Sequence, residues 1–152
     1  MDFSQITNDL FIGTTPEAQD YNRLRDLGVR LVINMRFARG PHPASHPEAL
    51  SFLWLRTIDS PILLIPLSTL VKGTHIALET IRQGGKVYSH CAAGRHRSVA
   101  MGAAILIAQG HTPEIAMQLI KKQRPIADPE IFYIRNRILR FAQHWHDKRW
   151  TT

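Results

Sequence analysis

Short apolar segments alternate along this chain with segments of helical spacing, and this alternation constrains the fold more than any other feature. Strand-like segments occupy residues 10–12, 29–35, 50–55 and 86–90. Helix-like segments occupy residues 16–27, 67–81, 98–109, 113–124 and 130–146. This order predicts an α/β fold with a central, mainly parallel sheet of four to five strands flanked by helices. The 152 residues fit a single domain, 1–152.

Helix-capping residues, glycines and prolines indicate where these helices and loops begin and end. Thr15 is a good N-cap for the first helix, which stops at Gly28. Residues 37–48 contain three prolines and read as a loop. Residues 98–109 are apolar on nearly every side, which predicts a buried helix.

The loops that follow the strands mark where a ligand is expected. In open parallel sheets, ligands bind beyond the carboxyl ends of the strands. Residues 36–39, 57–60 and 91–97 each follow the carboxyl end of a predicted strand. We therefore expect these three loops to converge on one rim.

Residues 90–98 read His-Cys-Ala-Ala-Gly-Arg-His-Arg-Ser, between a strand and an apolar helix. A tight loop entering a helix turns backbone N–H groups inward and forms an anion site. Gly94 permits the unusual backbone angle that such a loop needs. Cys91 would lie beneath the anion as a thiolate, and Arg97 can grip two phosphate oxygens.

This segment resembles the signature loop of cysteine phosphatases, His-Cys-x5-Arg-Ser, and the separation of 32 positions between Asp59 and Cys91 resembles the dual-specificity branch. The resemblance implies that Cys91 is the nucleophile and Arg97 the phosphate clamp. It implies that His90 supports the loop and the low thiolate pKa, and that Ser98 donates a hydrogen bond to the departing sulfur. The implied phosphate-binding residues are Ala92, Ala93, Gly94, Arg95 and His96.

A second loop supplies the acid that this family requires. Asp59 lies 32 positions before Cys91 and is the only acidic residue between Glu48 and Glu79. The resemblance implies that Asp59 protonates the leaving oxygen. Arg36 follows a strand end on the same side and is expected to contact substrate.

The resemblance covers most of the chain. It includes residues 6–13, 24–29, 33–36 and 124–126. One departure is Asp128, where many members carry an Asn whose side chain braces the signature loop.

The implied function is a metal-independent phosphomonoester hydrolase with a phosphocysteine intermediate and no cofactor. A dual-specificity protein phosphatase is expected, and its loop would also bind phosphate, sulfate or vanadate. A phosphatase for phosphoinositides or other polyanions is the alternative, supported by the basic Arg95 and His96. RNA 5′-phosphate also remains open as a substrate.

Three rival classes fit less well. Sulfurtransferases of the rhodanese type generally have a loop one residue shorter. Low-molecular-weight tyrosine phosphatases carry the cysteine loop and the acid in the reverse order. A phosphate-binding pseudophosphatase typically lacks the cysteine, the arginine or the acid, and this chain has all three.

Charge and histidine content bear on other possible functions. The net charge is +7, and residues 121–152 hold eight Lys/Arg against three acidic residues. A solvated helix face explains this charge better than nucleic-acid binding through Trp145 and Trp150. The pairs His42/His46 and His144/His146 lack further ligands at metal-binding spacing, so no metal site is expected. The lone cysteine and the lack of a membrane-length apolar run predict a cytoplasmic protein.

Overall fold

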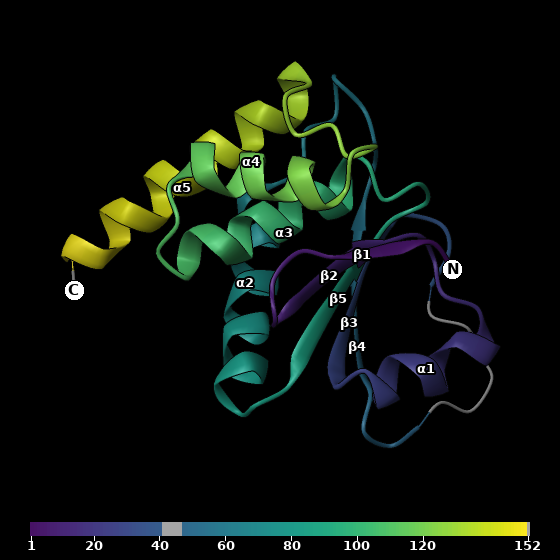
Figure 1. The fold of residues 1–152 in the computed structure, drawn as a ribbon. Coiled ribbons are helices and arrows are strands. Elements are labelled where there is room, and N and C mark those ends of the chain that lie inside the picture. Colours follow the sequence, from purple (N-terminus) through teal and green to yellow (C-terminus); the bar gives the residue numbers. More distant parts are fainter. Residues whose placement is uncertain (41–46, 152) are drawn as a thin grey trace.

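The computed structural model describes residues 1–40 and 47–151, with side chains through residue 148 (Figure 1). Its centre is a five-stranded sheet in the order β1-β2-β5-β3-β4. The strands are β1 (Phe3–Gln5), β2 (Leu10–Gly13), β3 (Val29–Arg36), β4 (Ser51–Thr57) and β5 (Lys86–His90). All neighbouring pairs are parallel except β1 with β2. The predicted mainly parallel α/β sheet is confirmed.

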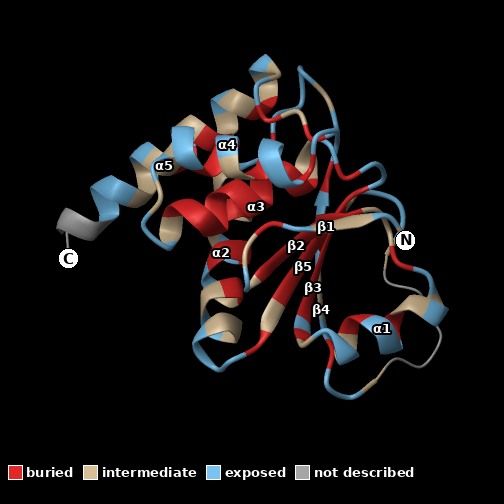
Figure 2. Cartoon of the chain, in the orientation of Figure 1, coloured by how far each residue is buried: buried red, intermediate tan, exposed pale blue. Residues whose placement is uncertain are grey.

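Helices cover both faces of this sheet, unequally. The short helices η1 (Ala18–Asp20) and α1 (Tyr21–Asp26) lie on one face (Figure 1). The other face carries α2 (Leu67–Arg82), α3 (Arg97–Ala108), α4 (Pro113–Gln123) and α5 (Phe132–Thr151). Figure 2 shows α3 as the most completely buried helix, as its apolar sequence predicts.

The alternation of side chains along the strands divides the core in two. Leu10 and Ile12 of β2 pack with the four-helix face, whereas Phe11 packs with Tyr21 and Leu24 of α1. This is the period of two expected for a strand covered on both sides. The sheet is therefore buried on both faces, and the loops of interest follow the carboxyl ends of its parallel strands.

Several predicted boundaries differ from the structure, among them the starts of the first and the last helix. The first helix begins at Ala18 with Glu17 as N-cap, because the Thr15 hydroxyl instead donates to the Cys91 carbonyl, 3.3 Å away. The last helix begins at Phe132 instead of 130, after a turn through Pro129. The edge strand β1 was not predicted, since three residues are too few for a periodic pattern.

Candidate active site

The signature loop, residues 91–96, joins β5 to α3 at the carboxyl ends of the parallel strands. As predicted, this loop lies next to the ends of β3 and β4, where the other two loops begin. Arg97 Nη1 donates to the carbonyls of Met35 and Thr57, 3.3 and 3.0 Å away, at the ends of β3 and β4. The buried Nε of Arg97 has no hydrogen-bond partner within the described part of the chain. A buried N–H without a partner is the donor that a bound anion would satisfy.

Cys91 lies at the base of this loop with 3% of its surface exposed. Its Sγ is 3.2 Å from Ser98 Oγ. Burial alone would raise the pKa of the Cys91 thiol. Hydrogen bonds from the side chain and amide of Ser98, the charge of Arg97 and the Gly94 amide outweigh burial, so the pKa lies below its usual value.

Gly94 allows the loop to pass close to the end of β2. Its φ is +65°, and a Cβ at this position would lie 2.8 Å from the backbone carbonyl of Gly13. A larger residue would be strained both by this contact and by the left-handed backbone conformation. The glycine of the motif is therefore fixed by the neighbouring strand as well as by the turn.

Arg124 braces the loop from behind, a role that the sequence did not reveal. Its side chain is 2% exposed, and its Nε donates to the Gly94 carbonyl over 2.8 Å. Its Nη2 reaches the Ala93 carbonyl at 3.3 Å and the Asp2 carboxylate at 3.2 Å. Two carbonyls of the loop thus share one buried guanidinium, which fixes the backbone of the loop at these two positions.

Asp128 contributes to the loop through its backbone. Its amide donates to the Arg95 carbonyl over 3.0 Å. This contact needs no particular side chain, so replacing the expected Asn by Asp leaves it intact. The Arg95 side chain is exposed, and its Nε donates to the Ile126 carbonyl over 3.1 Å.

Arg36 and His90 lie under the loop. Arg36 Nη1 donates to Thr15 Oγ1 over 3.1 Å, which in turn donates to the Cys91 carbonyl. Burial, then the charges of Arg39 and Arg97, lower the Arg36 pKa. His90 is buried, and this burial lowers its pKa to about 3, so its imidazole is neutral at physiological pH.

Asp59 is held on both carboxylate oxygens. His96 Nδ1 is 2.9 Å from Oδ2, and the Tyr133 hydroxyl donates to Oδ1 over 2.7 Å. Partial burial would raise the Asp59 pKa, but the hydrogen bonds from His96 and Tyr133 and the charges of His96 and Arg97 lower it. Asp128 Oδ2 lies 3.9 Å from the other ring nitrogen of His96. The pKa of Tyr133 is raised to about 12, first by burial and then by the hydrogen bond to Asp59 and the charges of Asp59 and Asp128.

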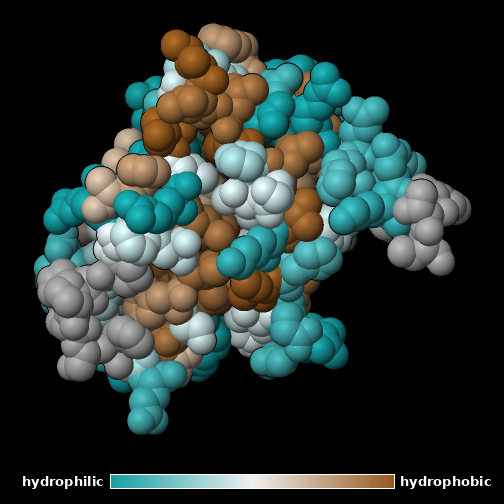
Figure 3. Space-filling model, turned by 180° about the vertical axis from the view of Figure 1, so that it is seen from behind, coloured by the Kyte–Doolittle hydropathy of each residue, from teal (hydrophilic) through white to brown (hydrophobic). Residues whose placement is uncertain are grey.

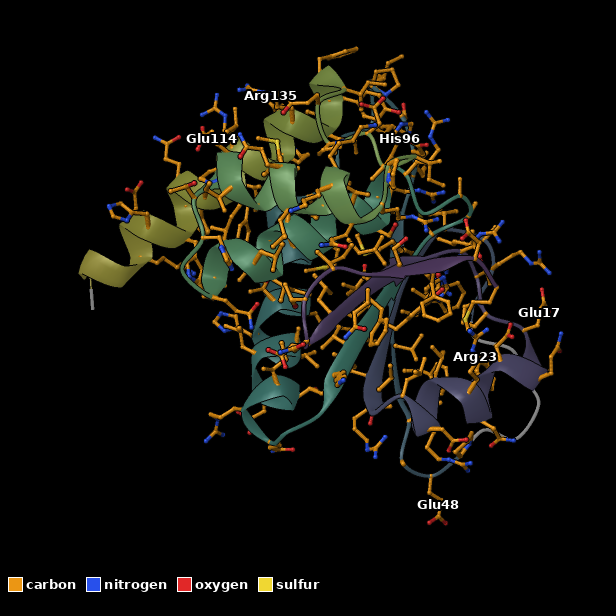
Figure 4. All side chains as sticks on the ribbon, in the orientation of Figure 1. Glu17, Arg23, Glu48, His96, Glu114 and Arg135 are labelled. Carbon is orange, nitrogen blue, oxygen red and sulfur yellow. The ribbon has the colours of Figure 1, made fainter. Side chains whose placement is uncertain are left out.

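We call the loop between β4 and α2, residues 58–66, the acid loop. Figure 4 shows His96 at the end of the molecule where the acid loop and the start of α5 meet. The structure thus brings together Cys91, Arg97, Ser98, Asp59 and His96, with Arg36 and His90 beneath them. No group of three or more metal-ligating side chains occurs among the residues described. His42 and His46 lie outside them, as does the Trp150 side chain.

Comparison with known proteins identifies the family to which this chain belongs. No protein-family model matches the chain. The chain is 30% identical to mouse dual specificity phosphatase 28 over 131 residues, which cover 85% of this chain and 77% of that protein. The chain belongs to the dual specificity phosphatases. It is also 36% identical to mouse phosphatidylglycerophosphatase and protein-tyrosine phosphatase 1, over 80% of this chain and 67% of the relative.

Solved structures of dual specificity phosphatases have the same fold. A mouse putative dual specificity phosphatase complexed with zinc tungstate has a TM-score of 0.86 at 25% identity, covering 97% of this chain and 90% of that one. PTPMT1 in complex with PI(5)P has a TM-score of 0.85 at 27% identity, covering 97% and 98%. The chain spans 65% of an Arabidopsis thaliana relative, dual specificity protein phosphatase 1, to which it is 29% identical over 87% of its own length.

Sequence reasoning missed three contributors to this dual specificity phosphatase site, namely Thr15, Arg124 and Tyr133. Tyr133 is 74 positions from Asp59, and Arg124 is 30 positions from Gly94. Only Arg124 gave a signal, as part of the recurrent segment before the last helix. None of the described helices is long and apolar enough to cross a bilayer.

Proposed function

We propose that this chain is a metal-independent phosphomonoester hydrolase that acts through a phosphocysteine, most specifically a dual-specificity protein phosphatase with one catalytic domain, residues 1–152. The observation that carries the proposal is the Cys91 sulfur 3.2 Å from Ser98 Oγ, beneath a loop closed by Arg97. A thiolate surrounded by amides and a guanidinium is an activated nucleophile facing an anion site.

In the first step the Cys91 thiolate attacks phosphorus, and the phosphorus–oxygen bond to the leaving group breaks. The loop amides from Ala92 to Arg97 and the Arg97 guanidinium stabilise the charge on the equatorial oxygens. Asp59 gives its proton to the leaving oxygen. Because fixed positive groups stabilise the transition state, the reaction requires no metal ion.

In the second step water attacks the phosphocysteine. Asp59, now a carboxylate, takes the proton from water, while the phosphorus–sulfur bond breaks. Ser98 donates a hydrogen bond to the leaving thiolate, which supports its departure. Phosphate and free Cys91 thiolate are the products.

Asp59 must serve as acid and then as base, and its two partners suit this exchange. His96 and Tyr133 stabilise the carboxylate form that the second step uses. A phosphoryl dianion bound beside Asp59 raises the carboxyl pKa, since a like charge disfavours ionisation. Substrate binding therefore favours the protonated acid needed in the first step.

Polyanionic phosphomonoesters, including phosphoinositides, are the second candidate substrate class. The exposed cation of Arg95 favours them, since it can attract a charge beside the scissile phosphate. A relative named phosphatidylglycerophosphatase and a neighbouring structure solved with PI(5)P also support this class. A pseudophosphatase that only binds phosphate fits less well, because Cys91, Arg97 and Asp59 are all present and converge.

Hydrolysis of an aryl phosphate in the presence of EDTA tests the proposal. The wild type should turn over, and vanadate should inhibit it because vanadate occupies the same anion site. Cys91→Ser should abolish turnover while retaining vanadate binding. Loss of wild-type activity in EDTA that a divalent metal restores would contradict the mechanism. Binding of phosphate without any turnover would instead indicate a pseudophosphatase.

A further inference from the structure

Exposed apolar side chains are concentrated around the signature loop. Ten large apolar side chains are exposed in the described part of the chain, and six of them lie on the acid loop, on the segment before α5 and at the start of α5. We call these six the apolar rim: Ile58, Ile62, Leu63, Leu64, Ile126 and Phe132. Figure 3, which keeps the same end uppermost, shows hydrophobic surface there.

The apolar rim is tied to the site by contacts. Ile58 is next to Asp59 in the chain. The Phe132 ring lies 5.5 Å from that of Tyr133, whose hydroxyl binds Asp59. The Ile126 carbonyl accepts the hydrogen bond from Arg95 of the signature loop. A surface that covered the rim would therefore also cover the mouth of the phosphate site.

The tip of the acid loop protrudes, and some of its backbone N–H and C=O groups already have hydrogen-bond partners within the chain. Ile62 is 86% exposed and Leu63 58%. Their amides donate to Ser60 Oγ over 3.1 and 3.2 Å, and Arg137 Nη1 reaches the Ile65 carbonyl at 3.5 Å. Satisfied backbone groups lower the cost of burying a loop in an apolar medium. A protruding apolar tip suits insertion into a bilayer interface, which requires no complementary groove on a partner.

Positive side chains lie on the elements next to the rim. Arg56 lies 4.7 Å from the ring centroids of both Phe37 and Trp54, and Lys121 Nζ donates to the Ala127 carbonyl over 2.8 Å. Of the acidic groups on the same elements, Glu130 pairs with Arg135, and Asp59 and Asp128 both lie next to ring nitrogens of His96. Apolar side chains between exposed cations are the combination that binds anionic membrane surfaces.

We propose that the apolar rim inserts into the headgroup region of an anionic lipid bilayer, which presents the signature loop to phosphomonoesters carried at that surface. The proposal that the chain docks on a membrane depends only on the apolar rim. The proposal that docking presents substrate to the signature loop rests on the proposed hydrolase function. A protein partner or a second copy of this chain on the same rim is the competing occupant.

Vesicle sedimentation of the full chain tests the docking. Vesicles of phosphatidylcholine alone and of phosphatidylcholine with 30% phosphatidylglycerol are compared at low and at about 0.15 M salt. The wild type should bind the anionic vesicles, more strongly at low salt. The variant I62N/L63N should bind about tenfold or more weakly, because two inserted side chains are lost. Leu27→Asn, beside α1 and away from the rim, is the matched control and should bind like wild type.

Turnover of a dissolved aryl phosphate separates this inference from the proposed function. I62N/L63N should keep wild-type turnover of this substrate and lose turnover of a phospholipid monoester in vesicles. Absence of vesicle binding by an active wild type would overturn the docking and leave the hydrolase intact. Equal binding to neutral vesicles, or a lipid-free dimer that I62N/L63N disrupts, would also overturn it. Vesicle binding without hydrolysis of any phosphate would overturn the proposed function alone.

Discussion

The carboxylate of Asp59 has a separate partner on each oxygen, and these partners come from different elements. His96 belongs to the signature loop and Tyr133 to the first turn of α5. Asp128 faces the other nitrogen of His96 at 3.9 Å. Because small displacements of an acid from the leaving group slow proton transfer, His96 and Tyr133 are expected to act as positioning residues for Asp59.

Substitutions of His96 test this positioning. Asn places its amide N–H near the position of Nδ1, whereas Gln places it near Nε2. His96→Asn should retain most of the turnover of phenyl phosphate, and His96→Gln should lose about tenfold in kcat. Asp59→Asn should lose about 100-fold. Both losses should shrink for 4-nitrophenyl phosphate, whose leaving group needs little protonation.

A double variant separates positioning from a general structural effect. In the Asp59→Asn protein, adding His96→Gln should cause no further loss of kcat, because the group that His96 positions is already inactive. Equal additional losses with both substrates would instead mean that His96 contacts the phosphate or supports the loop.

At the scale of elements, the sequence predicted well those features that depend on residues close together in the chain, such as strand ranges and helix caps. The range 86–90 was predicted without error for β5, and Thr112 caps α4 by accepting from the Ile115 amide. The start of the first helix was wrong because the Thr15 hydroxyl has a tertiary partner. The family pattern predicted Asp59 as the acid, which stays a prediction. It did not predict the contact of Asp59 with Tyr133, since a single tyrosine in a helix carries no sign of what it faces.

The brace between Arg124 and the signature loop joins two elements and gives a second prediction. Arg124→Lys keeps the charge but cannot reach the carbonyls of Gly94 and Ala93 together. We expect the free energy of unfolding to fall by about 2–4 kcal/mol, because buried acceptors lose their donor. The inhibition constant for vanadate should rise about tenfold or more as the loop amides lose their orientation.

Urea unfolding and vanadate inhibition measure these two effects. Arg135→Lys is the control, since Arg135 pairs with Glu130 on the surface and such pairs contribute about 1 kcal/mol or less. Unchanged vanadate inhibition in Arg124→Lys would mean that the loop holds its shape without the brace.

At the scale of the whole molecule, buried polarity is concentrated around one site. Seven polar or charged side chains are buried in the described part of the chain, and all but Thr74 lie in or beside the strand ends and loops of the site: Asn34, Thr57, Ser89, His90, Ser98 and Arg124. Burying a polar group costs stability unless its hydrogen bonds are satisfied. The two apolar cores on either side of the sheet offset this cost, so the stability of the whole fold supports the site.

His90 makes this cost measurable through pH. Burial lowers its pKa to about 3 in the folded protein, against about 6.5 for an unfolded chain. Between these values the unfolded state binds the additional proton, so the free energy of unfolding must fall as pH decreases from about 6.5 toward 3. The slope contributed by this one group approaches about 1.4 kcal/mol per pH unit.

Two variants isolate this contribution. Cys91, whose lowered pKa also makes stability rise with pH, is first removed by Cys91→Ser. Urea unfolding of Cys91→Ser and of Cys91→Ser/His90→Asn is then compared at pH 6.5, 5.5 and 4.5. Carboxylates that begin to titrate at the lowest pH are the same in both proteins, so their contribution cancels in the difference. The double variant should lose about 1 kcal/mol less per pH unit on acidification, because it has no imidazole to protonate in the unfolded state. Parallel pH dependence in the two proteins would mean that His90 accepts its proton without unfolding, and that the pocket beneath Cys91 admits a charged imidazolium.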